Sequence, residues 1–302
     1  MLCEEIRIGN QRVSVHDEGD RAGFFHTFED FRTGGTSSEG RKIHVFLPRN
    51  YAVSGRRYRV AYMNDGSTAF FEGGPANLSW NMAGTLSELY SRNIIDEVIV
   101  AAIYPLNRNR EYTHVPWGGP DCCGLEDYST YIAEHIKPFM DAHYPTLSAP
   151  ESNLVIGSSH GGLAAFYMAI RRPNCFGVVA ALSPSFWIGL DNRSQSAKAL
   201  PTRGATLRQS ELLRLLRPML MDHNRRPRIY LEWGLVRAGG PHNAEIEERA
   251  TARGREMADI LVKDFGYEIG RDLSIEEDPR GEHNEITWGR HIPGVLEFFF
   301  AV

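Results

Sequence analysis

The feature that most constrains this chain is an apolar run that leads directly into a Gly-x-Ser-x-Gly motif. Leu154–Ile156 has the character of a strand, and Gly157–Gly161 then places two glycines around Ser159. The following run, Leu163–Ala169, has the composition of a helix. This strand–turn–helix context is typical of a nucleophile elbow, in which glycines let the backbone turn tightly around a strained serine. The alternative is a glycine-rich turn without chemistry. We expect an exposed Ser159 hydroxyl, which needs a base and an oxyanion site around it to react.

Composition limits the classes of protein that this chain can form. Its 302 residues are 42% hydrophobic, which supports a large buried core, and its net charge is −5. Because no basic stripe occurs, we expect no nucleic-acid partner. No uninterrupted apolar stretch is long enough to span a bilayer, and residues Met1–Arg7 lack the pattern of a signal peptide, so we expect no membrane partner.

Four cysteines, Cys3, Cys122, Cys123 and Cys175, are spaced as neither a zinc site nor a disulfide framework. We therefore expect no metal and no organic cofactor. The adjacent pair Cys122 and Cys123 could form a vicinal disulfide, but two free thiols are the favoured interpretation. Free thiols in turn favour a reducing, cytoplasmic location.

Strand-like apolar runs alternate with helical patterns, which predicts an α/β protein with a mostly parallel sheet. The expected strands are Ile43–Leu47, Arg59–Met63, Val98–Ile103, Leu154–Ile156, Val178–Leu182, Ile229–Trp233 and Leu273–Glu276. The expected helices are Leu125–His143, His160–Arg171, Ser210–Met221, Ala244–Phe265 and Pro293–Phe300. We expect a single domain over residues 1–302. Residues 1–39 would be an N-terminal extension, with a β-hairpin packed beside the sheet as one form, and residues 189–208 a loop or partial lid.

A base for the serine is expected late in the chain, because this elbow accompanies the order Ser, acid, His. His283 follows the last expected strand and precedes the C-terminal helix, so a loop can bring its imidazole to Ser159. His291 and His242 are competitors of lower rank. His160 is adjacent to the nucleophile and points elsewhere by geometry.

An oxyanion site needs two backbone N–H groups. One is expected from His160, the residue after the nucleophile. The other is expected from the loop after an early strand, where Asn64-Asp65-Gly66-Ser67 follows Met63 and the glycine permits close backbone approach. The amide of Ser67 is the candidate, and a plain Asp-Gly turn is the alternative.

Several further motifs occur in a characteristic order. They are Tyr62–Gly66, Arg110–Thr113, Ile136–Phe139, Gly157–Gly162, Leu182–Trp187, and His283–Glu285 with Trp288. With these motifs the chain resembles the esterase D-like branch of the α/β-hydrolases over about residues 42–300. That branch includes feruloyl esterases, S-formylglutathione hydrolases, enterobactin-type siderophore esterases and mycolyltransferases. The resemblance implies an α/β-hydrolase fold with helices on both faces of the sheet and a small loop-rich lid. It also implies Ser159 as nucleophile, His283 as base, and the amides of Ser67 and His160 as oxyanion donors.

The acid is where this sequence departs from the family pattern. Relatives of this kind usually place Asp or Glu about three residues after the glycine that ends the penultimate strand. Here that glycine is Gly234 and the corresponding residue is Arg237, with no carboxylate in residues 235–243. Glu232 at the strand end is the favoured acid and Glu245 the alternative. A Ser–His dyad without an acid is also compatible with the sequence.

Aromatic residues are expected near the cleft. The family resemblance makes Trp187 a pocket wall, and Trp117 and Tyr112 are further candidates for substrate contact; core or lid packing is the alternative for each. The hypothesis is a serine carboxylic-ester hydrolase that acts on a small-molecule ester through an acyl-enzyme on Ser159. Two alternatives are an acyltransferase with the same acyl-enzyme and a catalytically silent binding protein with the hydrolase fold.

Overall fold

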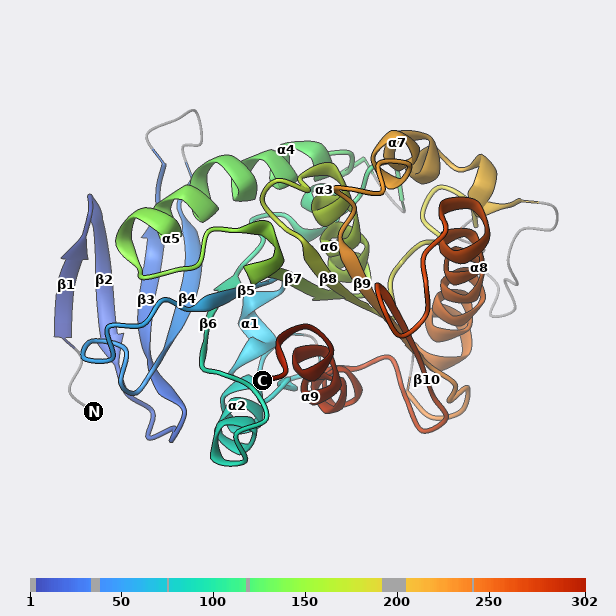
Figure 1. Cartoon of the computed structure of the whole chain (residues 1–302). Helices are drawn as coiled ribbons and strands as arrows, with labels where there is room; N and C mark the ends of the chain where they lie inside the picture. Colours follow the sequence, from blue (N-terminus) through green and yellow to red (C-terminus); the bar gives the residue numbers. More distant parts are fainter. Residues whose placement is uncertain (1–3, 34–38, 75, 118–119, 192–204, 241) are drawn as a thin grey trace.

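The computed structural model describes residues 4–33, 39–74, 76–117, 120–191, 205–240 and 242–302. Within these residues, ten strands form one sheet in the order β1-β2-β3-β4-β6-β5-β7-β8-β9-β10 (Figure 1). The strands are β1 (Glu4–Ile8), β2 (Gln11–His16), β3 (Gly23–Phe31), β4 (Arg41–Pro48), β5 (Arg59–Met63), β6 (Val98–Ile103), β7 (Asn153–Ser158), β8 (Val178–Leu182), β9 (Arg228–Gly234) and β10 (Leu273–Asp278). The pairs from β6 and β5 through to β10 are parallel, which confirms the expected mostly parallel sheet.

The N-terminal extension joins the sheet and does not pack beside it. β1 and β2 form an antiparallel hairpin, and β2 pairs with β3. β3 then pairs with β4 along most of its length, and β4 pairs antiparallel with β6. The buried rings of Phe25 and Phe46 contact each other across this β3–β4 pair, with 5.0 Å between their centroids. Burial of such rings stabilises the antiparallel extension of the sheet.

Helices cover both faces of the sheet, as expected. The α-helices are α1 (Gly66–Ala69), α2 (Met82–Ser91), α3 (Arg108–Glu111), α4 (Leu125–Tyr131), α5 (Lys137–His143), α6 (His160–Arg171), α7 (Glu211–Leu220), α8 (Glu248–Phe265) and α9 (Glu285–Phe300). Apolar side chains of α4 to α8 pack on one face in one core cluster. Those of α1, α2 and α9 pack on the other face in a second cluster (Figure 1).

Two π-helical turns interrupt the α-helical pattern. The turn η1 (Ile132–Ile136) joins α4 to α5, and η4 (Asn243–Glu247) leads directly into α8. Two 3₁₀ turns, η2 (Pro150–Ser152) and η3 (Leu207–Gln209), complete the helical elements of the described residues. α9 begins at Glu285, eight residues before the expected start at Pro293, because the Asn284 side chain caps it by accepting from the amide of Thr287.

The expected lid lies mostly outside the described residues, which leave out 192–204. No helix in the described ranges is long and apolar enough to cross a membrane.

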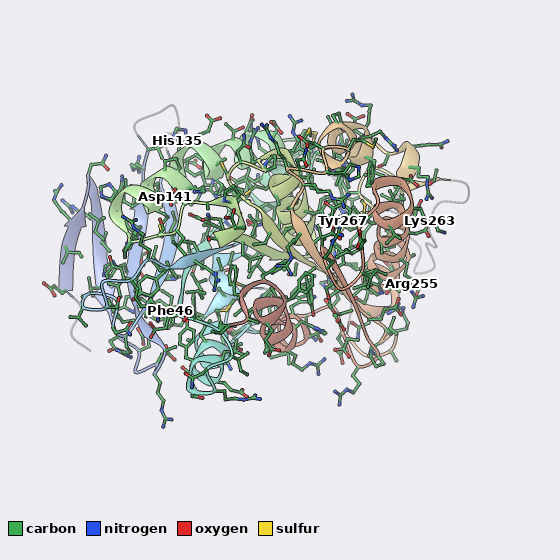
Figure 2. The ribbon with its side chains drawn as sticks, viewed as in Figure 1. Phe46, His135, Asp141, Arg255, Lys263 and Tyr267 are labelled. Atoms are coloured by element: carbon green, nitrogen blue, oxygen red, sulfur yellow. A yellow bond between two sulfur atoms is a disulfide. The ribbon has the colours of Figure 1, made fainter. Side chains whose placement is uncertain are left out.

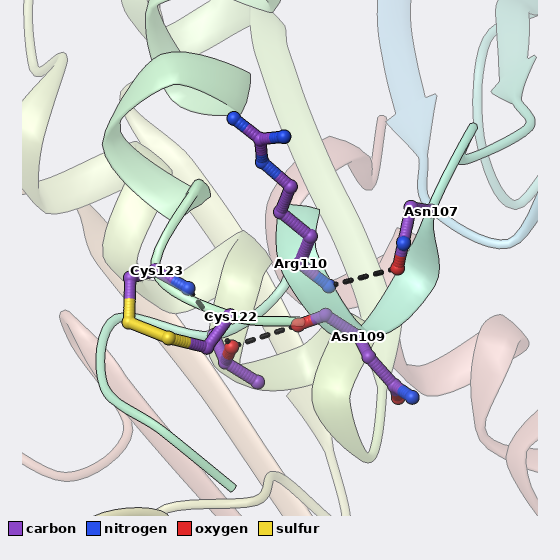
Figure 3. The surroundings of a disulfide bond; sticks show 6 residues. Asn107, Asn109, Arg110, Cys122 and Cys123 are labelled. Carbon is purple, nitrogen blue, oxygen red and sulfur yellow. Dashed lines mark hydrogen bonds between the residues drawn. A yellow bond between two sulfur atoms is a disulfide. The ribbon is translucent and has the colours of Figure 1, made fainter. Parts of the chain in front are cut away.

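Cys122 and Cys123 are joined by a disulfide (Figure 3), so the expectation of two free thiols is wrong. Cys123 adopts a positive φ of 72°, and its amide donates to the Thr113 hydroxyl at 3.4 Å. The Thr113 hydroxyl in turn donates to the carbonyl of Asn109 at 2.7 Å, so the loop folds back on the end of α3. The disulfide follows from this local fold of the loop, and an argument from the redox state of a cellular compartment does not take local fold into account. Cys175 is a half-buried free thiol.

The carboxyl ends of the parallel strands β5, β7, β8, β9 and β10 meet at one edge of the sheet, since parallel strands all point the same way. In open α/β sheets this edge is where ligands bind. The expected nucleophile follows β7, the expected base follows β10, and the Asn64–Ser67 loop follows β5.

Candidate active site

Ser159 lies in the strained turn that a nucleophile elbow requires. It stands between β7 and α6 with φ 55° and ψ −122°, a region that residues other than glycine rarely adopt. Its amide donates to the carbonyl of Leu182 on β8 at 2.9 Å. A Cβ on Gly157 would collide with the carbonyl of Gly161, so the turn needs this glycine. The serine is only 8% exposed, so it is largely buried at the sheet edge and the expectation of an exposed side chain is wrong.

His283 follows β10 and is held on three sides. Its amide donates to the Asn243 side-chain oxygen at 3.0 Å, and its ring packs edge-on against Trp288 with 5.0 Å between centroids. Nδ1 lies 2.5 Å from Oε2 of Glu247. A proton on Nδ1 that is donated to this carboxylate leaves Nε2 as the acceptor, which is the form that a general base needs.

Glu247 is fully buried, and its carboxylate is held from both sides. Oε1 accepts from the amide of Gly234 at 2.5 Å and from the hydroxyl of Ser183 at 2.9 Å, while Oε2 faces His283. Hydrogen bonds to a charged acceptor are stronger than neutral ones and fix its orientation. The carboxylate therefore holds the imidazole in one position.

Both acids expected from the sequence are wrong as partners of His283. Glu232 lies on β9, and its carboxyl oxygens have no hydrogen-bond partner in the described chain. Its nearest ion-pair partner is Nε2 of His291, at 3.5 Å. Glu245 is half-buried on η4, and no hydrogen bond joins it to His283 within the described residues. The reason is geometric: strand alternation turns Glu232 toward the α9 side, whereas the π turn brings Glu247 inward.

Among the described residues, neither competing histidine forms a side-chain hydrogen bond or ion pair with Glu247. Nε2 of His291 lies 3.2 Å from Asp278. The ring of His242 is 6.0 Å from that of His283, edge to face.

The loop after β5 is fixed against the start of α6. The Asn64 side chain donates to the carbonyl of Gly161 at 2.9 Å and accepts from the hydroxyl of Tyr128 at 2.7 Å. Asp65 adopts a left-handed conformation with φ 54°, and Arg108 pairs with both of its oxygens at 2.8 and 2.9 Å. The loop is therefore held by contacts with three separate elements: a main-chain carbonyl of α6 and side chains of α4 and α3.

This arrangement sets the two expected oxyanion donors at neighbouring helix starts. Ser67 is the second residue of α1, and His160 is the first residue of α6. Amides at such positions have no acceptor within their own helix and remain able to bind an anion. A Cβ on Gly66 would lie 2.7 Å from the backbone of Ala102, so glycine permits the close approach to β6.

A second serine, which the sequence reasoning did not assign, lies beside the nucleophile. Oγ of Ser185 is 3.4 Å from Oγ of Ser159 and 3.2 Å from Nδ1 of His160. Burial, together with the charges of Arg108 and His283, lowers the pKa of His160 to about 3. His160 is therefore neutral at neutral pH and interacts with Ser185 without bringing a positive charge next to the nucleophile.

The three aromatic candidates for substrate contact lie at different depths. Trp187 is 1% exposed and Tyr112 is fully buried, so both rings pack in the core. The Tyr112 hydroxyl accepts from the amide of Asp65 at 3.1 Å, which gives it a role in fixing the β5 loop. Trp117 is half-buried and packs against the core cluster. In the described part of the chain, no group of three His, Cys, Asp or Glu is arranged to hold a metal ion.

The chain matches known proteins over most of its length. Residues 36–299 match the model of the esterase family, described as "Putative esterase". The siderophore triacetylfusarinine C esterase of Aspergillus fumigatus is 25% identical over 223 residues, which cover 70% of this chain and 68% of that protein. The uncharacterised protein YbbA of Bacillus subtilis is 25% identical over 158 residues, which cover 49% of this chain. The chain spans 58% of the length of YbbA and 57% of that of a second Bacillus subtilis relative, YjcH.

The fold also matches solved structures. An IroE-like serine hydrolase from Shewanella oneidensis has a TM-score of 0.62 and 21% sequence identity, with 87% of this chain and 76% of that chain covered. This likeness agrees with the sheet order and the helices on both faces described above. The match to the family model, which covers most of the chain, shows that the protein belongs to the esterase family.

Proposed function

We propose that the protein is a serine carboxylic-ester hydrolase that acts on a small-molecule ester through an acyl-enzyme on Ser159. The observation that carries the proposal is the Glu247–His283 pair at the same sheet edge as the strained serine. A buried carboxylate, an imidazole and a strained serine in this fold correspond to the parts of a catalytic triad. The siderophore esterase relative supports a small-molecule substrate.

In the proposed mechanism, Nε2 of His283 takes the proton of the Ser159 hydroxyl as its oxygen attacks the ester carbonyl. Glu247 stabilises the imidazolium that forms and keeps the ring oriented. The amides of His160 and Ser67 hold the negative charge on the tetrahedral oxygen. The imidazolium then protonates the leaving alcohol, and the acyl group stays on Ser159. In the second half, His283 takes a proton from water, the water attacks the acyl carbonyl, and the acid leaves as Ser159 regains its proton.

The experiment that tests the proposal compares wild type with Ser159→Ala on a panel of p-nitrophenyl and cinnamoyl esters. We expect serine-dependent turnover, with kcat/KM lowered by ~10⁴-fold or more in the variant. Stoichiometric labelling of Ser159 by a fluorophosphonate, located by peptide mass spectrometry, gives a readout that does not depend on the choice of ester. Full turnover by the alanine variant would contradict the proposal. Product analysis with a competing alcohol separates hydrolysis from acyl transfer.

A further inference from the structure

Arg237 stands in the loop between β9 and η4, where the family pattern would have the acid. Its side chain does not face His283 but is held by four groups. Nε pairs with Oε2 of Glu248, and Nη2 donates to the hydroxyl of Thr251 at 2.6 Å. Nη1 donates to the carbonyls of Gly234 and Val236, each at 3.1 Å. The guanidinium therefore links the end of β9 to the first turn of α8.

Both ends of this link contact Glu247: Gly234 contacts the carboxylate that orients His283, and Thr251 contacts the main-chain carbonyl. The amide of Gly234 donates to Oε1 of Glu247, while the carbonyl of Gly234 accepts from Arg237. The Thr251 hydroxyl lies 2.9 Å from the carbonyl of Gly234 and 2.8 Å from that of Glu247. Arg237, Thr251, Gly234 and Glu247 thus form one connected hydrogen-bond network.

The network holds an element that is weak by itself. Glu247 ends a π turn, in which its amide donates to the carbonyl of His242, five residues back, at 3.0 Å. π turns are rare and occur mostly as single turns at functional sites, because their geometry is less favourable than that of an α-helix. A planar guanidinium with several donors in a fixed fork is suited to hold such a turn against a strand end.

Arg237 also pairs with the carboxylate that follows Glu247 in the chain. Glu247 and Glu248 follow each other in the chain, and Arg237 pairs with Glu248, which is half-buried. The positive charge of Arg237 balances Glu248, and Glu247 is the carboxylate that contacts His283.

We propose that Arg237 is a positioning residue that holds the π turn so that Glu247 meets Nδ1 of His283. The expected kinetic effects of this inference rest on the proposed function. The expected effect on the position of Glu247 rests on the hydrogen-bond network alone. Arg237 occupies the loop position of the family's usual acid, and the acid of this chain, Glu247, lies instead at the end of η4, directly before α8.

The test compares Arg237→Met and Arg237→Lys with Glu247→Gln and the double variant Arg237→Met/Glu247→Gln. Arg255→Met is the matched control, since Arg255 lies along α8 (Figure 2) and pairs with Glu277 in an exposed ion pair. Kinetics on p-nitrophenyl butyrate are normalised to the number of active sites that a fluorophosphonate labels at completion. This normalisation removes any loss that comes from unfolded protein.

We expect Arg237→Met to lower kcat by ~10- to 100-fold, with KM changed less than about threefold, because ground-state binding is untouched. In the Glu247→Gln background the same change should cost less than about twofold, since the two residues act as one unit. Lysine should recover part of the loss, because it keeps the charge but not the fork. Arg255→Met should match wild type.

A proton NMR signal from Nδ1–H of His283 gives a readout that does not need turnover. The short hydrogen bond to Glu247 should give a far-downfield resonance that is absent in Glu247→Gln, shifted or broadened in Arg237→Met, and unchanged in Arg255→Met. An unchanged resonance in Arg237→Met would overturn the proposal, as would equal kinetic losses in both Glu247 backgrounds. If wild type neither hydrolyses esters nor labels at Ser159, the proposed function fails, and the resonance alone decides the role of Arg237.

Discussion

Oε2 of Glu247 lies 2.5 Å from Nδ1 of His283, although 36 residues separate them in the chain. The pair joins the start of α8 to the loop after β10, because β9 and β10 are neighbouring parallel strands whose ends meet. Both side chains are almost completely withdrawn from water. A buried carboxylate that is hydrogen-bonded to an imidazole contributes orientation at a desolvation cost, which is more typical of a functional site than of a stabilising contact.

Replacement of Glu247 by glutamine should lower kcat by ~10²- to 10⁴-fold, because the amide cannot stabilise the imidazolium and can favour the wrong tautomer. Glu232→Gln and Glu245→Gln are matched controls, and we expect both to keep kcat within about threefold of wild type, since neither side chain contacts His283. Steady-state kinetics on a p-nitrophenyl ester measure all three. A larger loss of kcat in Glu232→Gln than in Glu247→Gln would show that Glu232 on β9 is the acid that acts on His283.

Loss of the Arg108–Asp65 pair should affect the oxyanion side of the site. Arg108 holds both oxygens of Asp65, and Asp65 precedes the amide of Ser67 by two residues. We expect Arg108→Met to lower kcat by ~10- to 100-fold. Without the ion pair the Ser67 amide would shift away from the developing oxyanion, which would then be less stabilised. Arg110→Met is the control, since Arg110 is exposed and no ion pair joins it to Asp65 in the described part of the chain. Equal kinetics for the two variants would show that the pair does not position the loop.

The disulfide can be tested by alkylation. Without prior reduction, the peptide that contains Cys122 and Cys123 should carry no iodoacetamide adduct, whereas two adducts should appear after treatment with a dithiol reductant. Mass spectrometry of the digested protein reports both states. Complete alkylation of unreduced protein purified from a reducing cytosol would restore the interpretation of two free thiols, on which the predicted cytoplasmic location depends.

Much of the fold follows from periodicity and local motifs. The strands Arg59–Met63, Val98–Ile103 and Val178–Leu182 have the predicted bounds, because each is a short apolar run between turn signals. The helix His160–Arg171 is also as predicted, since the elbow fixes its start. The β1–β3 extension was harder to place, because pairing at a sheet edge depends on partners distant in sequence.

Some residues of the candidate site could likewise be predicted from local sequence patterns, and others could not. Ser159 and His283 could be located because a motif and an order of elements mark their positions. Glu247 was missed because the π turn shifts the helix register, and no local signal marks such a turn. One signal was available: Glu247 shares the buried face of α8 with Ala250, Gly254 and Met257, a spacing typical of an inward helix face. The burial of Trp187 and Tyr112 depends on tertiary packing, which composition does not indicate.

Glu232 offers a test of stability that is separate from catalysis. Burial, reinforced by the charges of Glu247 and Asp278, raises the pKa of Glu232 well above its ordinary value of 4.5. The folded protein therefore keeps this proton at pH values where the unfolded chain releases it. The stability that the protonated carboxyl contributes is fully present below the unfolded pKa and is lost as pH rises toward the folded pKa.

Glutamine has a similar shape and does not ionise, so Glu232→Gln should be more stable than wild type at pH 8, and the difference should shrink toward zero at pH 4.5. Urea unfolding at both pH values measures it, and Glu276→Gln, an exposed change on the neighbouring strand, is the control. A difference that does not vary with pH would show that Glu232 is ionised in the folded protein. In that case His291, 3.5 Å away, would be its counter-ion, and His291→Gln would destabilise the protein at pH 8.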